Sequence, residues 1–288
     1  MTDKYAVIGN PIAHSKSPQI HRMFAEQTGQ VISYEAILAP LDGFIETVEQ
    51  LRKEGYKGCS VTVPFKFEAF SLVCTPQDTL SLQGICSQAA TNAHAANTLT
   101  FHKNFVNGDN TDGIGLVRDI QQNFHIPLKG KSILLMGAGG AAFGVLQSIL
   151  HEHPKKLTIA NRTLEKADKL HQLYAHLSQS ELSTCTYPDL SGSFDIIINA
   201  TSVGLSDIEI PLPSTIFAPD ALAYDMMYGR ETPFMKFSRE HHAQVADGLG
   251  MLIEQAAEAF FIWRSVRPDT SQVIAALQSS EKVNLEQD

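Results

Sequence analysis

The chain has 288 residues, of which 43% are hydrophobic and 18% are charged, a balance typical of a globular protein long enough for two domains. The formal net charge of −9 argues against nucleic acid or anionic membranes as partners, so an anionic ligand needs a locally positive site. No apolar run approaches the roughly 18 residues that cross a bilayer, and the first residues lack the layout of a signal peptide. We therefore expect a cytoplasmic protein with no membrane partner.

Cysteine and histidine positions indicate neither disulfide bridges nor a metal site. The four cysteines, none of which belongs to a CxxC pair, are Cys59, Cys74, Cys86 and Cys185. We expect them to be small buried side chains or free thiols. The adjacent His241 and His242 could suggest a metal, but neighbours on a helix point away from each other.

Periodicity and turn residues predict alternating strands and helices in the first part of the chain. Strands are expected at residues 5–9, 33–38, 58–63 and 97–102, and helices at 18–27, 41–54 and 112–124. The first helix is expected to have Ser17 as its N-cap, Pro18 as its first residue and Gly29 near its end. Residues 126–130 are typical of a linker.

The alternation continues after this linker. Strands are expected at residues 132–136, 156–161, 194–201 and 221–227, and helices at 140–152, 163–178 and 249–264. The last of these helices has no strand to follow, so we expect it to pack back on the first domain, and a frayed tail is expected from Ser279 onward. The sequence thus predicts an α/β fold with two domains, residues 1–112 plus 249–288 and residues 113–248.

A glycine turn at residues 137–142 follows an apolar run and precedes a helical stretch, which is the context of a dinucleotide-binding βαβ unit. Gly137 would allow the tight turn, Gly139 the close approach of a pyrophosphate, and Ala142 the packing of helix on strand. The N-terminus of the helix then faces the phosphates.

The end of the second strand in this unit indicates which dinucleotide binds. NAD enzymes usually place a carboxylate there, whereas this chain has Asn161, Arg162 and Thr163, followed by Lys166. A guanidinium suits the 2′-phosphate of NADP(H), so we favour NADP(H) over NAD(H). The alternative is that Arg162 is only a solvated charge at the start of a helix.

Two polar groups in the first domain are candidates for chemistry. Lys66 ends a strand-like run after a Pro-Phe break, and Asp112 belongs to a turn cluster at residues 107–113 that opens a helix. Taken alone, Lys66 can be a solvated lysine and Asp112 an ordinary N-cap. Both can also face a cleft.

The order of these motifs resembles that of shikimate dehydrogenases over nearly the whole length. The matching segments are residues 9–18 (GNPIAHSKSP), 61–66 (VTVPFK), 97–99 (NTL), 108–113 (GDNTDG), 137–141 (GAGGA), 161–163 (NRT), 198–202 (INATS), 224–226 (YDM) and 246–252 (ADGLGML). The resemblance implies an N-terminal substrate domain and a Rossmann-type NADP domain with a cleft between them. It also implies NADPH-dependent, reversible reduction of 3-dehydroshikimate to shikimate, on the route to chorismate and the aromatic amino acids.

The resemblance also implies roles for individual residues. Ser15 and Ser17 correspond to the serines that hold the substrate carboxylate, at a helix N-terminus. Lys66 corresponds to the proton-transfer lysine, with Asp112 as its partner. The positions around the ring hydroxyls are Thr62, Asn97, Asp112, Tyr228 and Gln255. The cofactor positions are Gly137, Ala138, Gly139, Gly140, Ala141, Asn161, Arg162, Thr163 and Lys166, with Met226 and Gly248 near the nicotinamide.

The chain departs from the family pattern in two places. Ser60 stands where asparagine is common, and the stretch from Lys66 to Asn97 is longer than usual. We expect the extra residues to form a surface loop or a helix extension. An acidic residue near the cofactor is usual in this stretch, and either Asp78 or Gln88 corresponds to it.

Two rival functions remain open. One is a quinate/shikimate dehydrogenase with relaxed cofactor use, against which the serine pair and residues 161–163 argue. The other is a non-catalytic, shikimate-dehydrogenase-like regulatory module, against which the retained Lys66 and Asp112 and the lack of a basic segment argue. The expected partner is a small-molecule substrate, with no nucleic acid, and the expected state is a monomer or homodimer.

Overall fold

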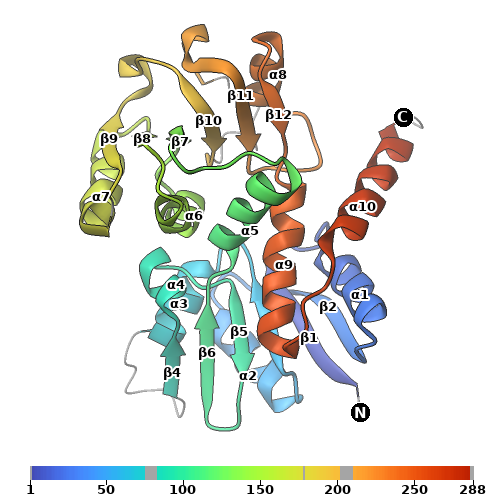
Figure 1. Cartoon of the computed structure of the whole chain (residues 1–288). Helices are drawn as coiled ribbons and strands as arrows, with labels where there is room; N and C mark the ends of the chain where they lie inside the picture. The colour runs from blue at the N-terminus through green and yellow to red at the C-terminus, as the bar shows by residue number, and fades with distance from the viewer. Residues whose placement is uncertain (1, 75–82, 178, 202–209, 286–288) are drawn as a thin grey trace. The chain divides into compact units, whose positions relative to one another are not determined.

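Two six-stranded sheets organise the chain, one in each of two compact units. The computed structural model describes residues 2–74, 83–177, 179–201 and 210–285 (Figure 1). The first unit is Met1–Gly115 with Ile253–Asp288, and the second is Leu116–Leu252. The expected α/β fold class is therefore confirmed.

The first unit contains a mixed sheet with the order β2-β1-β3-β5-β6-β4. Its strands are β1 (Asp3–Gly9), β2 (Ile32–Leu38), β3 (Gly58–Val61), β4 (Gln83–Cys86), β5 (Thr98–Phe101) and β6 (Phe105–Asp109). Its helices are α1 (Ser17–Thr28), α2 (Phe44–Lys53), α3 (Lys66–Cys74), α4 (Gln88–Ala93) and α10 (Thr270–Leu285). Two helices pass from one unit to the other, α5 (Asp112–Arg118) and α9 (Leu249–Arg264). Among the strands in the described part of this unit, only β5 runs antiparallel to its neighbours, β3 and β6.

The second unit contains a parallel sheet with the order β12-β11-β10-β7-β8-β9, which is the Rossmann order. Its strands are β7 (Ser132–Met136), β8 (Lys156–Ala160), β9 (Glu181–Cys185), β10 (Phe194–Asn199), β11 (Phe217–Asp225) and β12 (Gln244–Ala246). Its helices are α6 (Gly140–His151), α7 (Leu164–Tyr174) and α8 (Pro233–Glu240), and short helical turns lie at η1 (Asp119–Asn123), η2 (Ala175–Leu177), η3 (Tyr187–Asp189) and η5 (Ser214–Ile216).

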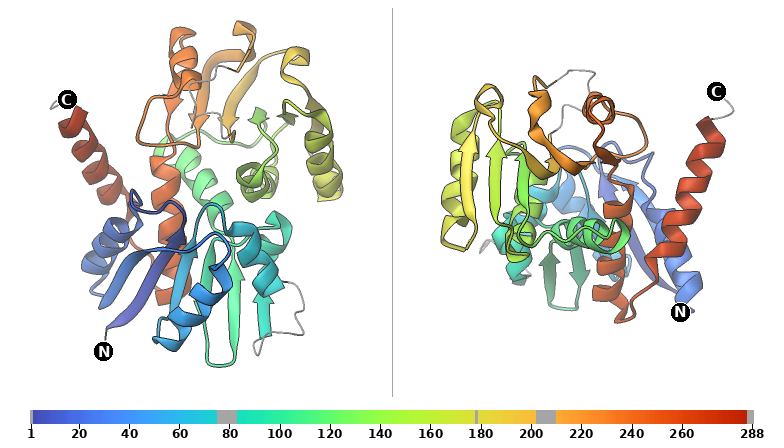
Figure 2. Two further views of the ribbon diagram at one scale, coloured as in Figure 1. Left: turned by 180° about the vertical axis from the view of Figure 1, so that it is seen from behind. Right: turned by 45° about the horizontal axis from the view of Figure 1, so that its top comes forward.

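Both faces of the second sheet are buried, as a parallel sheet requires. In β7, Ile133 and Leu135 belong to the core cluster that includes residues of α6 and α7, whereas Leu134 and Met136 belong to a cluster that includes Phe234 of α8. Figure 2 shows the helices of this unit on both sides of its sheet. Burial on both faces explains why the central strands β7 and β10 are almost continuously apolar.

Three details of the helices differ from expectation. Lys16, not Ser17, is the N-cap of α1, and Ser17 is the first helical residue. The expected helix at 112–124 is regular only to Arg118 and continues as the π-helical turn η1. Helix α10 runs to Leu285, beyond Ser279 where a frayed tail was expected, and its buried residues Val273 and Leu277 lie before that point.

A disulfide corrects the expectation that all four cysteines are unbridged. Cys74 at the end of α3 is bonded to Cys86 at the end of β4, with their Cα atoms 5.0 Å apart. The backbones of α3 and β4 come this close because Gly84 has no side chain, since a Cβ there would lie 2.2 Å from the carbonyl oxygen of Val73. Cys59 and Cys185 are free thiols.

Residues 75–82 of the stretch between Lys66 and Asn97 lie outside the described residues, so the surface loop or helix extension expected there stays a prediction. The described residues of this stretch form α3, the edge strand β4, which pairs in parallel with β6, and the short helix α4. Asp78 lies outside the described residues.

Candidate active site

One edge of the first sheet collects most of the predicted substrate residues. Parallel strands β1 and β3 end at this edge, and so does β6, whereas the antiparallel β5 begins there. Segments that follow or precede these ends therefore lie close together. They carry Ser15 and Ser17 after β1, Thr62 and Lys66 after β3, Asn97 before β5, and Asp112 after β6.

Lys66 and Asp112 form an ion pair at this edge. The Nζ atom of Lys66 lies 2.5 Å from Oδ2 of Asp112, and the side chains are 28% and 8% exposed, respectively. Each residue begins a helix, α3 for Lys66 and α5 for Asp112, so the backbone at both ends of the contact is fixed. A lysine ammonium has three donors, so this bond leaves others for a ligand.

Asn97 holds the carboxylate of Asp112 from the other side. Its Nδ2 atom donates to Oδ1 of Asp112 at 2.9 Å, and its Oδ1 atom accepts from the N–H of Thr111 at 2.9 Å. Asn97 is almost completely buried. The carboxylate is thus fixed between an amide and an ammonium, which keeps Oδ2 directed at Lys66.

Gln255 of α9 completes this cluster, because its Oε1 atom accepts from the hydroxyl of Thr111 at 3.2 Å and from Nδ2 of Asn97 at 3.4 Å. Thr111 and Asn110 were not among the predicted site residues, although both belong to the turn cluster at residues 107–113. Asn110 donates to the carbonyl of Ala95 at 3.0 Å and accepts the N–H of Asp112 at 3.0 Å.

The serine pair lies at the start of α1. Oγ of Ser15 accepts the N–H of Ser17 at 3.3 Å, and Ser17 is buried whereas Ser15 is half-buried. The first turn of α1 contains no acidic residue, so nothing there opposes an anion at the helix N-terminus. Thr62 lies close to the end of β1, because a Cβ on Gly9 would lie 2.5 Å from its methyl group.

Ser60, the departure from the family pattern, has a protein partner. The hydroxyl of Tyr34 donates to Oγ of Ser60 at 2.9 Å. Burial raises the pKa of Tyr34, so its hydroxyl keeps its proton and stays a donor.

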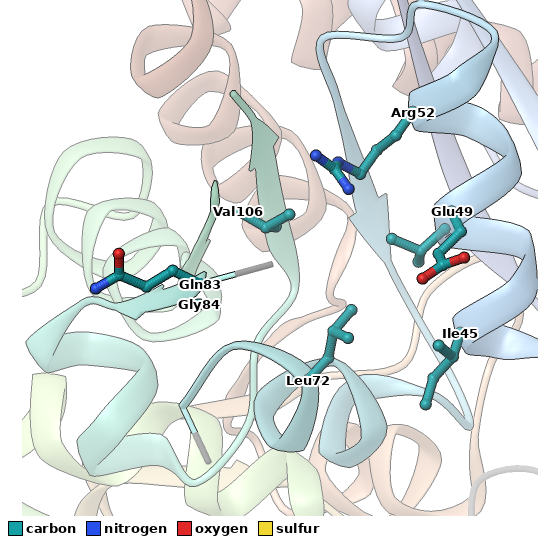
Figure 3. Close-up of a pocket in the computed structure, with 8 residues that line it drawn as sticks. Ile45, Glu49, Arg52, Leu72, Gln83, Gly84 and Val106 are labelled. Atoms are coloured by element: carbon teal, nitrogen blue, oxygen red, sulfur yellow. The ribbon is translucent and has the colours of Figure 1, made fainter. Parts of the chain in front are cut away.

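A separate shallow pocket in the first unit lies among α2, α3, β4 and β6 (Figure 3). Its lining combines the apolar side chains of Ile45, Val48, Leu72 and Val106 with Glu49, Arg52, Gln83 and Gly84. Among the described residues, none of the predicted substrate or cofactor positions lines it, so we assign it no role in the chemistry.

In the second unit, the predicted cofactor segments all follow the carboxyl ends of parallel strands. The glycine turn follows β7, residues 161–166 follow β8, Met226 follows β11 and Gly248 follows β12. In doubly wound sheets, ligands bind at this edge, where the strand order reverses. Here the order reverses between β7 and β10.

The glycine turn fits a dinucleotide pyrophosphate. Gly137 has φ of +100°, a conformation that favours glycine, and a Cβ there would lie 3.0 Å from the carbonyl oxygen of Ala200. Around Gly139, a Cβ would meet nothing within 4 Å, so space is open in front of the backbone where a phosphate would approach. Gly139 is also the N-cap of α6 and offers no side-chain cap to its N–H groups.

The segment after β8 presents cations. Arg162, Thr163 and Lys166 are exposed, and Nδ2 of Asn161 donates to the carbonyl of Thr163 at 2.7 Å. Within the described part of the chain, no carboxylate pairs with either cation. They are therefore free to meet a 2′-phosphate.

The loops after β11 and β12 contact one another. The N–H of Gly248 donates to the carbonyl of Met227 at 2.8 Å, and a Cβ on Gly248 would lie 2.3 Å from the carbonyl oxygen of Met226. Tyr228 follows in the same loop and is half-buried. Tyr228 belongs to the second unit, so its role at the substrate stays a prediction.

Gln88, one of two candidates for a polar group near the cofactor, is the first residue of α4. Its Nε2 atom donates to Oδ1 of Asn92 at 2.7 Å in an exposed position. Its role stays a prediction. Among the described residues, no cluster of three metal-ligating side chains occurs, and no helix is both long and apolar enough to span a membrane.

Comparison with family models matches three parts of the chain. Residues 7–99 match the shikimate dehydrogenase substrate binding domain, residues 118–207 match shikimate / quinate 5-dehydrogenase, and residues 248–278 match the shikimate 5′-dehydrogenase C-terminal domain. Together these models include the segments that carry the Lys66 strand end and the glycine turn.

Individual relatives match nearly the whole chain. A shikimate dehydrogenase (NADP(+)) of Methylobacillus flagellatus is 55% identical over 96% of this chain and 100% of its own length. The crystal structure of an Ael1 enzyme from Pseudomonas putida is similar with a TM-score of 0.87, 46% identity, and coverage of 96% of this chain and 98% of that chain. A shikimate 5-dehydrogenase of Thermus thermophilus, solved with NADP(H) and shikimate, has a TM-score of 0.81, 28% identity, and coverage of 96% and 99%.

Proposed function

Because the chain belongs to the shikimate dehydrogenase family, we propose that it reduces 3-dehydroshikimate reversibly to shikimate with NADPH, a step toward chorismate and the aromatic amino acids. The observation that supports this most directly is the ion pair of Lys66 and Asp112, held in place by Asn97. The cofactor is NADP(H), as in the relatives named shikimate dehydrogenase (NADP(+)).

Lys66 is the proposed proton donor. Reduction of a ketone places negative charge on its oxygen, and an ammonium within hydrogen-bond reach stabilises that charge and supplies the proton. Asp112 fixes the direction of the Lys66 ammonium through the 2.5 Å contact. The half-buried lysine can recover a proton from solvent after each turnover.

The substrate polar groups find matching partners in the first unit. We propose that Ser15 and Ser17, at the start of α1, bind the carboxylate, and that Thr62, Asn97, Asp112 and Gln255, together with Tyr228 of the second unit, bind the ring hydroxyls. A site built to hydrogen-bond hydroxyls discriminates strongly, since an analogue that lacks one leaves buried polar groups unpaired. The paired Asn97 and Asp112 are buried groups of this kind.

The second unit is the proposed cofactor domain, with predicted borders at residues 113 and 248. Bound NADPH supplies the hydride. In this assignment the pyrophosphate meets the backbone of Gly137, Ala138, Gly139, Gly140 and Ala141. The 2′-phosphate meets Asn161, Arg162, Thr163 and Lys166, and the nicotinamide lies near Met226 and Gly248. The open space at Gly139 and the unpaired cations support this assignment.

The test is an assay of shikimate and quinate with NADP⁺ and NAD⁺ in all four pairs, following the absorbance of the reduced nicotinamide. We expect shikimate with NADP⁺ to give the highest kcat/KM. Comparable values with quinate or NAD⁺ would support the relaxed quinate/shikimate enzyme. No turnover with any pair would support the regulatory module.

Three further proposals concern the setting of the enzyme. We propose that it is cytoplasmic, that it has no nucleic-acid partner and that it is a monomer or homodimer. The net charge of −9 supports the second of these. Light scattering of the purified protein measures the oligomeric state.

A further inference from the structure

A buried carboxylate at the carboxyl end of β11 has no part in the mechanism described above. Asp225 is completely buried and accepts three hydrogen bonds. Its Oδ2 atom accepts from Nδ2 of Asn199 at 3.0 Å and from the hydroxyl of Thr232 at 2.6 Å, and its Oδ1 atom accepts from the N–H of Met227 at 2.9 Å. All its partners are donors, which suits an ionised carboxylate because that group only accepts.

Asn199 extends this network to the loop after β10. Its Oδ1 atom accepts the N–H of Thr201 at 3.1 Å and the Thr201 hydroxyl at 2.7 Å. Thr201 and Ala200 in turn lie against the glycine turn, because a Cβ on Gly137 would come within 3.2 Å of the Thr201 methyl and 3.0 Å of the Ala200 carbonyl oxygen. The network therefore joins the loops after β10 and β11 and borders the turn after β7.

The segment that this network fixes is Met226 and Met227. The N–H of Met226 donates to the carbonyl of Asn199 at 3.0 Å, and the carbonyl of Met227 accepts from Gly248 at 2.8 Å. The N–H of Met227 is the group bound by Asp225. Neighbouring strands thus hold the segment from both sides, and Asp225 makes the contact that comes from a side chain.

Thr232 fixes the other end of the same loop. Besides donating to Asp225, its hydroxyl accepts the N–H of Met235 at 3.2 Å and so caps the N-terminus of α8. Thr232 is buried. The loop of residues 226–232 is therefore tied at its start and at its end to one carboxylate.

We propose that Asp225 is a positioning residue, which through Asn199 and Thr232 holds the Met226–Met227 segment where it lines the nicotinamide end of the NADP(H) site. This inference rests on the proposed function, which places Met226 and Gly248 near the nicotinamide. An amide at position 225 would turn its NH₂ group toward a donor and leave that donor unpaired.

The test compares Asp225→Asn and Thr232→Val with two controls. Thr232→Ser keeps the hydroxyl that reaches Asp225. Thr158→Val removes another buried hydroxyl of the same sheet, which lies 3.0 Å from Ser183 Oγ, outside the cofactor segments. We expect kcat to fall about 10- to 100-fold in Asp225→Asn, because a small displacement of reacting groups has effects of this size. The fall in kcat should be smaller in Thr232→Val. Thr232→Ser should keep the wild-type kcat.

Two readouts separate positioning from stability. The emission of the nicotinamide of NADPH on binding should change in Asp225→Asn and Thr232→Val, with little change in Kd, because the 2′-phosphate is bound elsewhere. The primary isotope effect on kcat with 4-deuterated NADPH should rise in the same two variants. Neither quantity should change in Thr158→Val, even where its Tm falls.

The inference is overturned if kcat falls only in proportion to the folded fraction, with wild-type nicotinamide emission and isotope effect. If Asp225→Asn does not fold, Thr232→Val decides between these results. Failure of the proposed function shows separately, as a wild-type protein that does not reduce 3-dehydroshikimate. In that case the NADPH emission of the variants still tests the positioning role.

Discussion

At the scale of single residues, Lys66 owes its proposed role to its neighbours rather than to its own environment. The side chain is only half-buried, but its partner Asp112 is buried and is fixed by Asn97. The ammonium therefore cannot turn away without leaving a buried carboxylate short of a donor, which costs about 1–3 kcal/mol or more for a charged group. This cost holds the Lys66 ammonium in one position beside Asp112.

Replacing Lys66 by alanine should lower kcat by about 10²- to 10⁴-fold, the usual contribution of a positioned acid or base, with a smaller effect on KM. Lys66→Arg should also be slow, because a guanidinium keeps the charge but does not release its proton. Steady-state kinetics with NADPH and 3-dehydroshikimate at neutral pH measure both variants. Full activity of the alanine variant would refute the assignment.

Arg162 should contribute to cofactor choice through its charge. Arg162→Ala is expected to raise KM for NADPH and to narrow the preference for NADPH over NADH roughly 10-fold or more, since a hydrogen bond to a charged group is worth about 1.5–3 kcal/mol. The ratio of kcat/KM for the two cofactors measures this. Lys169→Ala, which removes an exposed cation within α7, is the matched control and should leave the ratio unchanged.

His21 should make stability depend on pH. It is completely buried, neither ring nitrogen has a partner among the described residues, and burial lowers its pKa to about 3. In the unfolded chain, His21 is protonated below about pH 6.5, whereas in the folded protein it stays neutral until about pH 3. The contribution of His21 to the free energy of unfolding is therefore constant above pH 6.5. Below pH 6.5 it decreases stability by up to about 1.4 kcal/mol per pH unit.

The variant that tests this is His21→Phe, which keeps an aromatic ring against Tyr34, whose ring centroid lies 4.0 Å away. Chemical denaturation at pH 7 and pH 5 gives the free energy of unfolding of both proteins. The loss of stability between these values should be smaller in the variant. An equal loss would show that His21 does not titrate as its burial requires.

At the scale of secondary-structure elements, the sequence predicted the elements whose pattern is long enough to be distinctive. The apolar run of β7, the glycine turn, and helices such as α1 and α9 appear close to their expected places. Strands β4, β6, β9 and β12 were missed, because each has at most five residues and so carries too short an apolar pattern. Three of them, β4, β9 and β12, are also edge strands.

The site residues likewise fall into a predicted group and a missed group. The topology of the first sheet brings Lys66, Asn97 and Asp112 together, and motif order had selected each of them. Thr111 and Asp225 escaped notice because their importance lies in buried hydrogen bonds, which no sequence spacing reveals. The disulfide escaped for a similar reason, since its two cysteines are 12 residues apart and meet only because Gly84 lets β4 approach α3.

Reducing this disulfide should lower the free energy of unfolding by about 3 kcal/mol, the effect expected for a cross-link that closes a loop of this size. Thermal unfolding with and without dithiothreitol measures the change. The double variant Cys74→Ser/Cys86→Ser should unfold at the Tm of the reduced protein and should not respond to dithiothreitol. Equal Tm values for the oxidised and reduced wild type would show that the bridge contributes nothing to stability.

At the scale of the whole molecule, the chain passes twice between the units, within α5 after Gly115 and within α9 after Leu252. Just inside the second unit, these two passages are packed on each other without a spacer. Gly250 of α9 lies against Asp119, since a Cβ on this glycine would come 2.0 Å from Oδ1 of the carboxylate. Asp119 is itself buried and accepts the hydroxyl of Tyr224 at 2.5 Å.

Gly250→Ala should therefore destabilise the second unit more than the loss of a single hydrogen bond does. The added methyl group must displace either α9 or the Asp119 carboxylate, at a cost of about 1–3 kcal/mol for overpacking, plus the bond from Tyr224 if the carboxylate moves. Tyr224→Phe removes that bond alone and should cost about 1–3 kcal/mol, because it leaves a buried carboxylate oxygen without this donor. Calorimetry of the two variants and of the double variant decides between the two displacements. If the carboxylate moves, Tyr224→Phe should lower the stability of the Gly250→Ala variant only slightly, because its hydrogen bond is already lost. If the two stability losses add up, α9 has shifted and the hydrogen bond has survived. A Tm of Gly250→Ala equal to that of the wild type would refute the close packing of the two passages.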